Sequence, residues 1–199
     1  ADAITAAVGA QLDAGRRVLA LGGDHAVTFP VLRAYAARHP GLSIVHIDAH
    51  PDLYDDFEGD PLSHASPFAR IMEVGLAARL VQIGIRASNP HQRAQAERFG
   101  VATFGSEQVN AAISALPSGP VYLSVDLDGL DPAFAPGVKH HEPGGLTTRE
   151  VLAIIAAIPG PLVGADIVEL CPACDQGEMT AKLAAKLLKE VAARLWADR

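Results

Sequence analysis

The sequence predicts an α/β fold in which helices cover both faces of a mainly parallel, twisted sheet. Six short runs rich in β-branched residues alternate with longer segments of helical pattern along the 199 residues. Such alternation is typical of parallel sheets, because each crossover helix returns the chain to the same end of the sheet. The chain is 49% apolar and has no internal repeat or low-complexity linker, so we expect residues 1–199 to form one domain.

Each predicted strand is a short apolar run bounded by polar, Gly or Pro residues. In chain order, the runs are Arg17–Leu21, Leu42–Asp48, Leu80–Ile85, Val101–Phe104, Val121–Asp126 and Leu162–Val168. Helical patterns lie near residues 2–14, 26–39, 66–76, 90–99, 106–115 and 147–158. A last helix is predicted over about 180–197, where an apolar stripe at helical spacing contains Leu183, Leu187, Leu188, Val191 and Leu195.

The composition restricts the partners of the chain. A net charge of −7 argues against a nucleic-acid partner, and no apolar run approaches the roughly 18 residues of a membrane span. Metal ions and small cationic molecules remain as possible ligands. No signal peptide is visible, so we expect a cytoplasmic protein. Cys171 and Cys174 are too few for a disulfide framework, and no second pair completes a four-cysteine zinc site, so two free thiols are expected.

Polar groups with metal-ligand chemistry follow three of the predicted strands. The first strand is followed by Gly22-Gly23-Asp24-His25, the second by Asp48-Ala49-His50-Pro51-Asp52, and the fifth by Asp126-Leu127-Asp128-Gly129-Leu130-Asp131-Pro132. Binding sites of open parallel sheets form beyond the carboxyl ends of the strands. Two long polar loops, Pro51–Ser66 and Gly129–Leu146, lie at the same ends, and long loops in compact domains are usually functional.

Alternation lets these side chains converge, because residues i, i+2 and i+4 of an extended chain point the same way. The convergent set is His25, Asp48, His50, Asp52, Asp126 and Asp128. Four buried carboxylates cannot crowd together uncompensated, whereas two divalent cations balance their charge. Oxygen and nitrogen ligands without thiolate suit Mn²⁺, and less specifically Fe, Co, Ni or Zn. Each group alone is ordinary turn chemistry, but three such groups at strand ends favour a binuclear metal site.

The three motifs, in this order, resemble the signatures of the ureohydrolases, the arginase and agmatinase family of binuclear manganese enzymes. The resemblance extends to Ser63-His64-Ala65-Ser66 and Asp166-Ile167-Val168-Glu169. The stretch from Phe134 to Val138, continuing to Glu142–Leu146, most resembles the plant-type arginases. The resemblance implies an arginase-like three-layer sandwich. It also implies an N-terminally short version, since only about 20 residues precede the first motif.

The resemblance implies a role for each ligand. His25 and Asp52 would bind one Mn²⁺, His50 and Asp128 would bind the other, and two carboxylates would bridge them. The bridging pair is Asp48 and Asp126. Asp52 would also hold the attacking hydroxide through its free oxygen.

The resemblance also implies catalytic and substrate-binding residues. Glu169 would pair with the planar guanidinium, and His64 would carry a proton to the leaving amine. Tyr54 stands where animal arginases place an amide that contacts the amino-acid end of the substrate. His140 and His141 either line the pocket mouth or are solvated loop residues. Relatives assemble as trimers or hexamers, so a homo-oligomer is expected.

Several functions remain open at this point. Arginase is the first hypothesis, agmatinase a close second, and other guanidino compounds are further candidates. The acidic loop that contains Asp55, Asp56, Glu58 and Asp60 favours a cationic substrate tail. A catalytically inactive metal-binding remnant is the alternative of a different class. A deacetylase-like amidohydrolase with a single zinc is less consistent with the paired Asp126 and Asp128.

Overall fold

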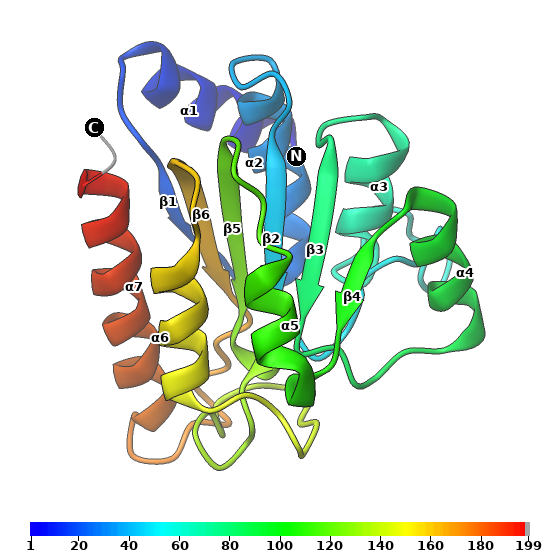
Figure 1. Cartoon of the computed structure of the whole chain (residues 1–199), viewed down its shortest axis with the longest axis vertical. Helices are drawn as coiled ribbons and strands as arrows, with labels where there is room; N and C mark the ends of the chain where they lie inside the picture. Colours follow the sequence, from blue (N-terminus) through cyan, green and yellow to red (C-terminus); the bar gives the residue numbers. More distant parts are fainter. Residues whose placement is uncertain (198–199) are drawn as a thin grey trace.

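The computed structural model describes residues 1–197, in which six strands form one fully parallel sheet (Figure 1). The strands are β1 (Leu19–Leu21), β2 (Ser43–Ile47), β3 (Arg79–Ile83), β4 (Ala102–Phe104), β5 (Val121–Asp126) and β6 (Leu162–Val168). Their order across the sheet is β1-β6-β5-β2-β3-β4. All six predicted strands are confirmed, and their ends differ from the predicted ones by no more than two residues.

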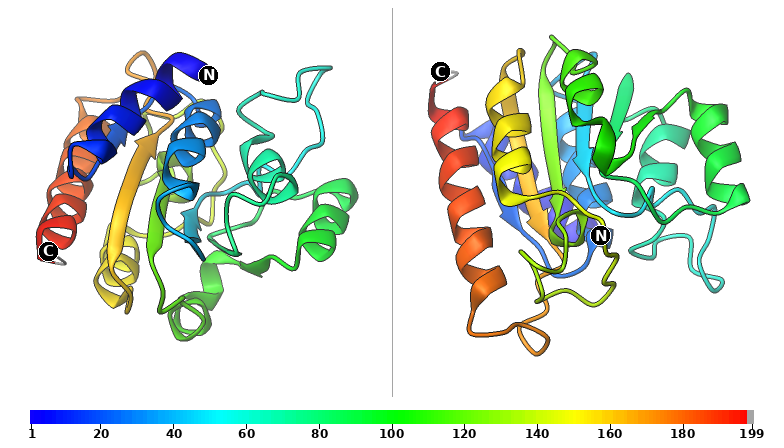
Figure 2. Two further views of the ribbon diagram at one scale, coloured as in Figure 1. Left: turned by 90° about the horizontal axis from the view of Figure 1, so that it is seen from above. Right: turned by 60° about the horizontal axis from the view of Figure 1, so that its bottom comes forward.

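Helices cover both faces of the sheet and enclose two apolar cores, as the sequence predicts (Figures 1 and 2). The helices are α1 (Asp2–Asp13), α2 (Thr28–Ala36), α3 (Pro67–Glu73), α4 (Pro90–Phe99), α5 (Val109–Ser114), α6 (Thr148–Ala157) and α7 (Met179–Ala197). One core joins the sheet to α5, α6 and α7, and the other joins it to α1, α2 and α3. The predicted α/β sandwich is therefore confirmed.

The apolar stripe predicted for the last helix faces the sheet. Leu183, Leu187, Val191 and Leu195 of α7 are buried, and Leu188 packs at the margin of the same core. The opposite side of α7 carries lysines and remains exposed, so the helix is amphipathic. No helix within residues 1–197 has the length and apolar character needed to cross a bilayer.

The order of the strands places a crevice between β2 and β5. From β2 the chain continues to β3 and β4 on one side, whereas from β5 it continues to β6 on the other side. Ligands of open α/β sheets bind at such a switch point, outside the carboxyl ends of the strands. These ends lie at the bottom of the sheet in Figure 1, beside the long loops.

A glycine allows the two strand ends to approach closely there. A Cβ atom on Gly129, which follows β5, would lie 2.8 Å from the backbone nitrogen of Asp48, which follows β2. Any side chain at this position would push the two segments apart. Because Gly129 has no side chain, Asp48 can lie close to the end of β5.

Candidate metal centre and substrate pocket

Three strand ends supply the polar groups of the site. Asp48 follows β2, Asp126 ends β5, and His25 begins a 3-10 turn, η1 (His25–Val27), after β1. Local hydrogen bonds fix these turns, because the side chain of Asp24 accepts from the Ala26 N–H and that of Asp126 accepts from the Asp128 N–H. Short Asp side chains favour such turns through these bonds. The turns direct the next polar side chains into the crevice.

His25 lies at the centre of a first cluster. Its Nδ1 atom is 3.1 Å from Oδ2 of Asp48, 3.1 Å from Oδ2 of Asp52 and 3.2 Å from Oδ2 of Asp126. All four side chains are buried, and His25 has no exposed surface. Nevertheless, within the described chain Nδ1 makes no hydrogen bond of acceptable geometry with any of the three carboxylates.

The other ring nitrogen of His25 explains this arrangement. Nε2 lies 2.9 Å from the Ser124 hydroxyl, and that hydroxyl donates its single proton to Asp166 at 2.6 Å. Ser124 can therefore only accept from His25, so Nε2 carries the proton. In the neutral form of the ring, which is the form that binds a metal, Nδ1 is a bare lone pair that faces three carboxylate oxygens.

A cation fits this donor set. A lone pair and three carboxylate oxygens repel one another, and a positive charge between them converts the repulsion into coordination. Burial lowers the pKa of His25, but contacts with Asp126, Asp48 and Asp52 raise it well above its ordinary value. The cluster therefore attracts a positive charge strongly, and a divalent metal ion would supply it.

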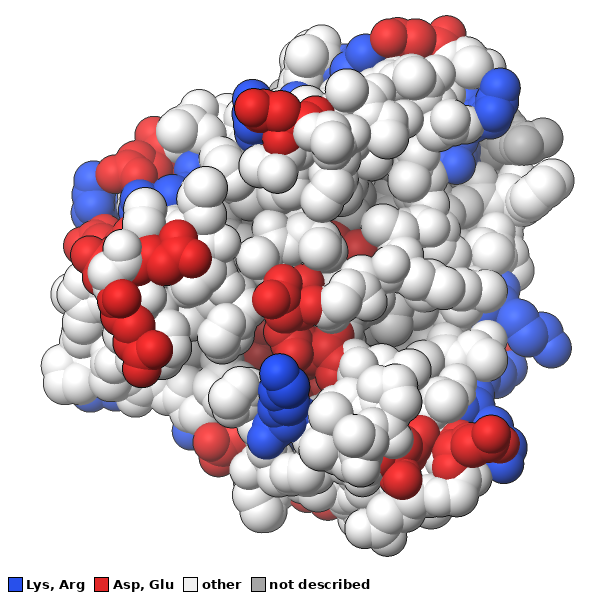
Figure 3. Space-filling model, turned by 180° about the vertical axis from the view of Figure 1, so that it is seen from behind, with Lys and Arg blue, Asp and Glu red and all other residues white. Residues whose placement is uncertain are grey.

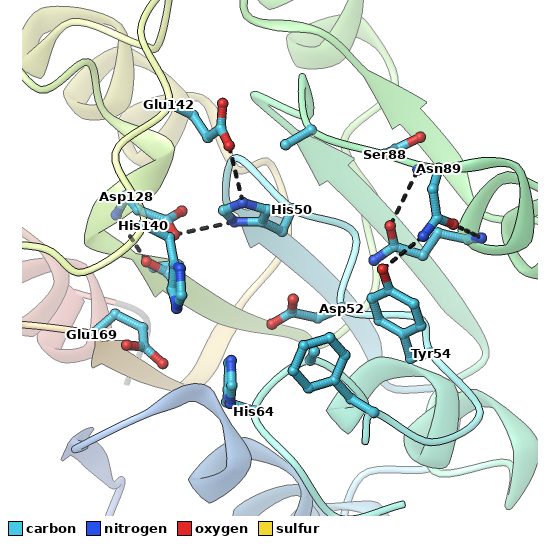
Figure 4. Close-up of a pocket in the computed structure, with 15 residues that line it drawn as sticks. His50, Asp52, Tyr54, His64, Ser88, Asn89, Asp128, His140, Glu142 and Glu169 are labelled. Carbon is cyan, nitrogen blue, oxygen red and sulfur yellow. Dashed lines mark hydrogen bonds and ion pairs between the residues drawn. The ribbon is translucent and has the colours of Figure 1, made fainter. Parts of the chain in front are cut away.

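A second cluster lies beside the first. Nδ1 of His50 is 3.1 Å from Oδ2 of Asp128 (Figure 4). The same atom is 3.4 Å from Oδ1 of Asp48. Asp48 thus directs Oδ2 toward His25 and Oδ1 toward His50. This two-sided contact is the geometry expected of a bridging carboxylate. Glu142 lies 3.7 Å from Nε2 of His50, on the side away from Asp128.

The electrostatics of the carboxylates also favour cations. Burial, together with the charge of Asp48, raises the pKa of Asp52 to about 7 and that of Asp128 to about 6. Burial and the charges of Asp128 and Asp48 raise the pKa of Asp126 well above its ordinary value. Each shift means that a further negative charge is costly in this crevice. Bound cations would remove that cost.

His46 is a buried group of the site that the sequence analysis did not identify. Its Nε2 atom lies 2.8 Å from Oδ2 of Asp48, and its Nδ1 atom lies 3.1 Å from the amide nitrogen of Gln82. Burial lowers the pKa of His46 to about 4, so the ring is neutral and donates one proton to Asp48. The two-residue spacing of His46 and Asp48 at the end of β2 is the sequence signal that could have identified it.

The described residues contain two compact groups of metal-ligand atoms, both of which include Asp48. One group is His25, His46 and Asp48, and the other is Asp48, His50 and Asp128. Asp52 and Asp126 complete the first group through their contacts with His25. The structure thus brings together all six residues that the sequence nominates as metal ligands.

A cleft of about 400 Å³ opens onto these carboxylates. In Figure 3 Asp and Glu residues occupy the floor of a central depression, a basic side chain borders them, and uncharged residues form most of the rim. The lining includes the metal-ligand candidates His50, Asp52, Asp126 and Asp128, and it also contains Tyr54, Phe57, His64, Ser88, Asn89, Gln92, His140, Glu142 and Glu169. The dimensions and the concave shape are those of a small-molecule site.

Glu169 lies in the cleft at the end of β6 and is firmly positioned. Its Oε1 atom accepts from the backbone N–H of His25 at 2.8 Å, and its own N–H donates to the carbonyl of Gly23 at 2.9 Å. Its φ of 66° and the φ of 51° of Asp52 are left-handed values that few residues other than Gly adopt. Backbone strain of this kind is concentrated at functional sites.

His64 and Tyr54 occupy different parts of the cleft (Figure 4). The ring of His64 lies parallel to that of His140, with centroids 5.7 Å apart, on the side of Glu169. Tyr54 lies on the opposite side, where its hydroxyl accepts from the amide of Asn89 at 2.6 Å. Asn89 caps α4, so the tyrosine is tied to the start of that helix. His140 lines the cleft, whereas His141 contacts the carbonyl of Pro136 outside the lining.

Comparison with known proteins identifies the family. The model of the Arginase family matches residues 1–193. This chain belongs to the arginase family. It is 50% identical over 188 residues to Arginase 1, mitochondrial, of Arabidopsis thaliana, and 37% identical over 196 residues to an agmatinase of Bacillus anthracis. These matches cover 90% and 96% of this chain, and 55% and 68% of the relatives.

The fold agrees with this family assignment. The structure of an arginase from Medicago truncatula superimposes with a TM-score of 0.90 at 46% identity, over 96% of this chain and 64% of that chain. The predicted family and its resemblance to plant-type arginases are therefore confirmed. The chain spans about half the length of the curated plant arginases that it matches.

One expectation is wrong. The sequence analysis expects a cytoplasmic protein, but the plant arginases of this family that match at 49–50% identity are named as mitochondrial, or as chloroplastic and mitochondrial. The expectation rested on the lack of a visible leader in these 199 residues, and that observation carries no information on location.

Proposed function

We propose that this chain hydrolyses the guanidino group of a small cationic substrate to urea and an amine, with L-arginine as the first candidate. The observation that carries the proposal is the placement of Glu169 in the same cleft as the paired carboxylates. Membership of the arginase family and the similarity to plant arginases support it. An inactive metal-binding remnant would not need Glu169, a carboxylate that is positioned to bind a substrate beside the metals.

Two Mn²⁺ ions are the proposed cofactors. His25 and Asp52 would hold one ion, His50 and Asp128 the other, and Asp48 and Asp126 both. Nitrogen and oxygen donors without thiolate support manganese. When bound, such a pair supplies a hydroxide nucleophile near neutral pH. The family-based roles and the geometry agree best for Asp48, whose two oxygens face the two histidines.

Glu169 would bind and orient the guanidinium. A carboxylate accepts two parallel N–H bonds from this planar cation, and the charge strengthens both. The bond from the His25 N–H holds one oxygen of Glu169 at a fixed distance from the first cluster. Binding there would aim the guanidinium carbon at the metal pair, which is the positioning that a poor electrophile requires.

His64 would move a proton to the departing amine. It lies in the cleft on the side of Glu169, and an imidazole can both accept and donate a proton. Its parallel contact with His140 and its edge contact with Phe57 restrict the ring. The amine would therefore meet a proton donor of defined orientation as the C–N bond breaks.

Agmatine is the second candidate, because the cleft offers no cationic side chain to a substrate carboxylate. None of the residues that line it in the described chain is Lys or Arg, and Glu142 adds an acidic group. The neutral hydrogen-bonding groups at the Tyr54 end, including Ser88 and Asn89, would have to bind the α-carboxylate of arginine. Agmatine lacks that carboxylate.

The deciding experiment is a urea-release assay with Mn²⁺ across arginine, agmatine and shorter guanidino acids. We expect urea from arginine, with agmatine as the competing outcome, and two metal ions per chain by mass spectrometry. Two bound metals with no urea from any compound would establish the inactive remnant. One metal or none, without urea, would contradict both the binuclear site and the activity.

We also propose that the chain self-associates, as a trimer or hexamer. β1 is an edge strand of only three residues, and Leu21 at its end is 66% exposed. Exposed edges and apolar side chains favour association. Sedimentation velocity should show an oligomer at tens of micromolar. A fully active monomer at that concentration would contradict this proposal.

A further inference from the structure

Two thiols lie in contact on the loop that follows Glu169. The Sγ atoms of Cys171 and Cys174, the two cysteines of the chain, are 3.0 Å apart. Cys171 is half-buried and Cys174 is exposed, so a small oxidant in solvent reaches the pair. Cys171 is only two residues from the proposed guanidinium-binding carboxylate. The function proposed above uses neither thiol.

Backbone contacts hold the pair in place. The N–H of Cys171 donates to the carbonyl of Gly137 at 2.8 Å, and the N–H of Cys174 donates to the carbonyl of Cys171 at 3.0 Å. Beyond the pair, Asp175 accepts from Thr180 N–H at 2.9 Å, at the start of α7. The two sulfur atoms therefore meet in an anchored turn rather than on a free tail.

The electrostatic environment favours thiolate at one of the two positions. Contact with Cys174 lowers the pKa of Cys171, and the charge of Lys139 lowers it further. The same contact raises the pKa of Cys174. A thiolate is the attacking species in disulfide exchange, so Cys171 is suited to attack first and Cys174 to respond.

We propose that Cys171 and Cys174 form a reversible disulfide, which makes this loop a redox-active site beside the substrate pocket. With glutathione disulfide as oxidant, the Cys171 thiolate attacks one sulfur and expels one glutathione thiolate. Cys174 then loses its proton to solvent, attacks the Cys171 sulfur and expels the second glutathione. Two cysteine thiols are oxidised, and one glutathione disulfide is reduced to two glutathione molecules.

Because the loop is short, this bond is suited to a reversible switch rather than to a cross-link that stabilises the fold. A disulfide stabilises mainly by closing a long loop of the unfolded chain, and here the loop contains only four residues. Bond formation shortens the sulfur separation from 3.0 Å to about 2.0 Å, a movement of about 1 Å. Cys171 is hydrogen-bonded to Gly137 and lies two residues from Glu169, so this movement acts on the segment that carries a pocket-lining carboxylate.

The experiment is a redox titration of the wild-type holoenzyme. The protein is equilibrated with glutathione buffers from fully reduced to fully oxidised, the thiols are trapped by alkylation, and intact masses are measured. We expect both thiols to disappear together, with the loss of two hydrogen atoms and no added glutathione. Thiols that stay free in the oxidised buffers, or disulfides between chains, would overturn the proposal.

Single substitutions separate the two roles. In the same oxidised buffers, Cys174→Ser should retain one glutathione on Cys171, because the second attack is impossible. Cys171→Ser should acquire glutathione more slowly. The double serine variant should remain unmodified. Equal rates of modification in the two single variants would contradict the assignment of Cys171 as the first nucleophile.

The link to the pocket is tested on the same samples and rests on the proposed function. We expect a severalfold difference in KM between reduced and oxidised protein at equal metal content, and no such difference in the double serine variant. Identical KM values would overturn the link. Thiol trapping does not depend on urea release, so failure of the hydrolase activity and failure of the dithiol site are distinguishable.

Discussion

The Nδ1 atom of His25 faces three carboxylate oxygens at 3.1–3.2 Å, and its orientation depends on residues on other strands. Ser124 on β5 accepts the proton of the opposite ring nitrogen, and Asp166 on β6 accepts the proton of Ser124. Asp166 in turn accepts from Tyr122 and Thr28. A chain of fully satisfied buried bonds therefore fixes which nitrogen faces the cluster.

Glu169→Gln should separate guanidinium binding from metal binding. The amide keeps an oxygen for the His25 N–H but loses the negative charge, so fold and metal content should persist. Charge-assisted bonds are about twice as strong as neutral ones, so kcat/KM should fall roughly a hundredfold or more, about 3 kcal/mol. Urea-release kinetics and manganese content are measured on one preparation.

Glu178→Gln is the matched control. Glu178 also has a positive φ, of 60°, but it is exposed and lies outside the pocket lining. Its substitution should leave kcat/KM unchanged. A Glu169→Gln variant with full metal and near-normal kcat/KM would remove Glu169 from the site.

Asp126→Asn and Asp128→Asn should affect the two metals differently. Asp126 is proposed as a bridge, so its loss should weaken both metals and abolish turnover. Asp128 contacts His50 and not His25, so its loss should weaken one metal more than the other. Calorimetric Mn²⁺ titration resolves the two sites. Equal weakening of both sites in both variants would contradict the ligand assignment.

The sequence predicted the residues of the site better than their supporting contacts. The six ligand candidates were predictable because their position at or just after strand ends is a local property of the chain. The expected alternation of an extended chain does not place Asp128, which lies in a 3-10 turn over Leu127–Gly129. The bond from His25 N–H to Glu169 spans 144 positions, and no local pattern encodes it. His46 was missed, although its alternation with Asp48 is local, because a histidine inside an apolar run has the appearance of a core residue.

At the scale of elements, the approach of β5 to the end of β2 depends on Gly129. Gly129→Ala should place a methyl group 2.8 Å from the backbone nitrogen of Asp48 and separate the two segments. Overpacking of this kind costs about 1–3 kcal/mol, so Tm should fall by roughly 2–10 °C. Mn²⁺ affinity should fall as well, because Asp48 and Asp128 move apart. Scanning calorimetry measures Tm, and titration calorimetry measures Mn²⁺ affinity.

Gly119→Ala serves as the control for that substitution. A Cβ atom on Gly119 meets no atom within 4 Å, so neither Tm nor metal affinity should change appreciably. If Gly129→Ala behaved in the same way, the close approach would not determine the geometry of the metal centre.

Element boundaries were predictable to within a few residues, with one systematic difference. The helices expected over 26–39 and 106–115 begin as 3-10 turns, η1 and η2 (Ser106–Gln108), before α2 and α5. Propensity does not distinguish a 3-10 turn from the first turn of an α-helix. In η1 the tighter turn matters, because it carries His25 into the crevice.

At the scale of the whole molecule, the buried carboxylates should make stability depend on pH when metal is removed. The pKa of Asp52 is raised from 3.8 to about 7, and that of Asp128 from 3.8 to about 6. The folded state therefore holds these protons more tightly than the unfolded state. Stability is greatest below the unfolded value and falls as pH rises toward the folded values.

Metal-free protein should therefore have a lower Tm at about pH 7 than at about pH 4.5, although the buried His46, with its pKa lowered to about 4, offsets part of the difference. Saturating Mn²⁺ should raise Tm at pH 7 and reverse this trend, because the ions bind only the folded state. Asp52→Asn should flatten the dependence in metal-free protein, whereas Glu97→Gln, an exposed carboxylate, should not. Scanning calorimetry measures Tm for the metal-free protein, the Mn²⁺-saturated protein and the two variants. A Tm that rises with pH in metal-free wild-type protein would contradict the electrostatic account.

The order of the strands has a consequence for how the molecule is made. β1 pairs with β6, so during synthesis β1 lacks this partner until β6 has been made. The same holds for the metal centre, where His25 must wait for Asp126. Contacts so distant in sequence form late and slow the folding of a domain. Nascent chains that end before Asp126 therefore lack one group of the first cluster, and a metal that needs all four groups could bind only after β5 has been made.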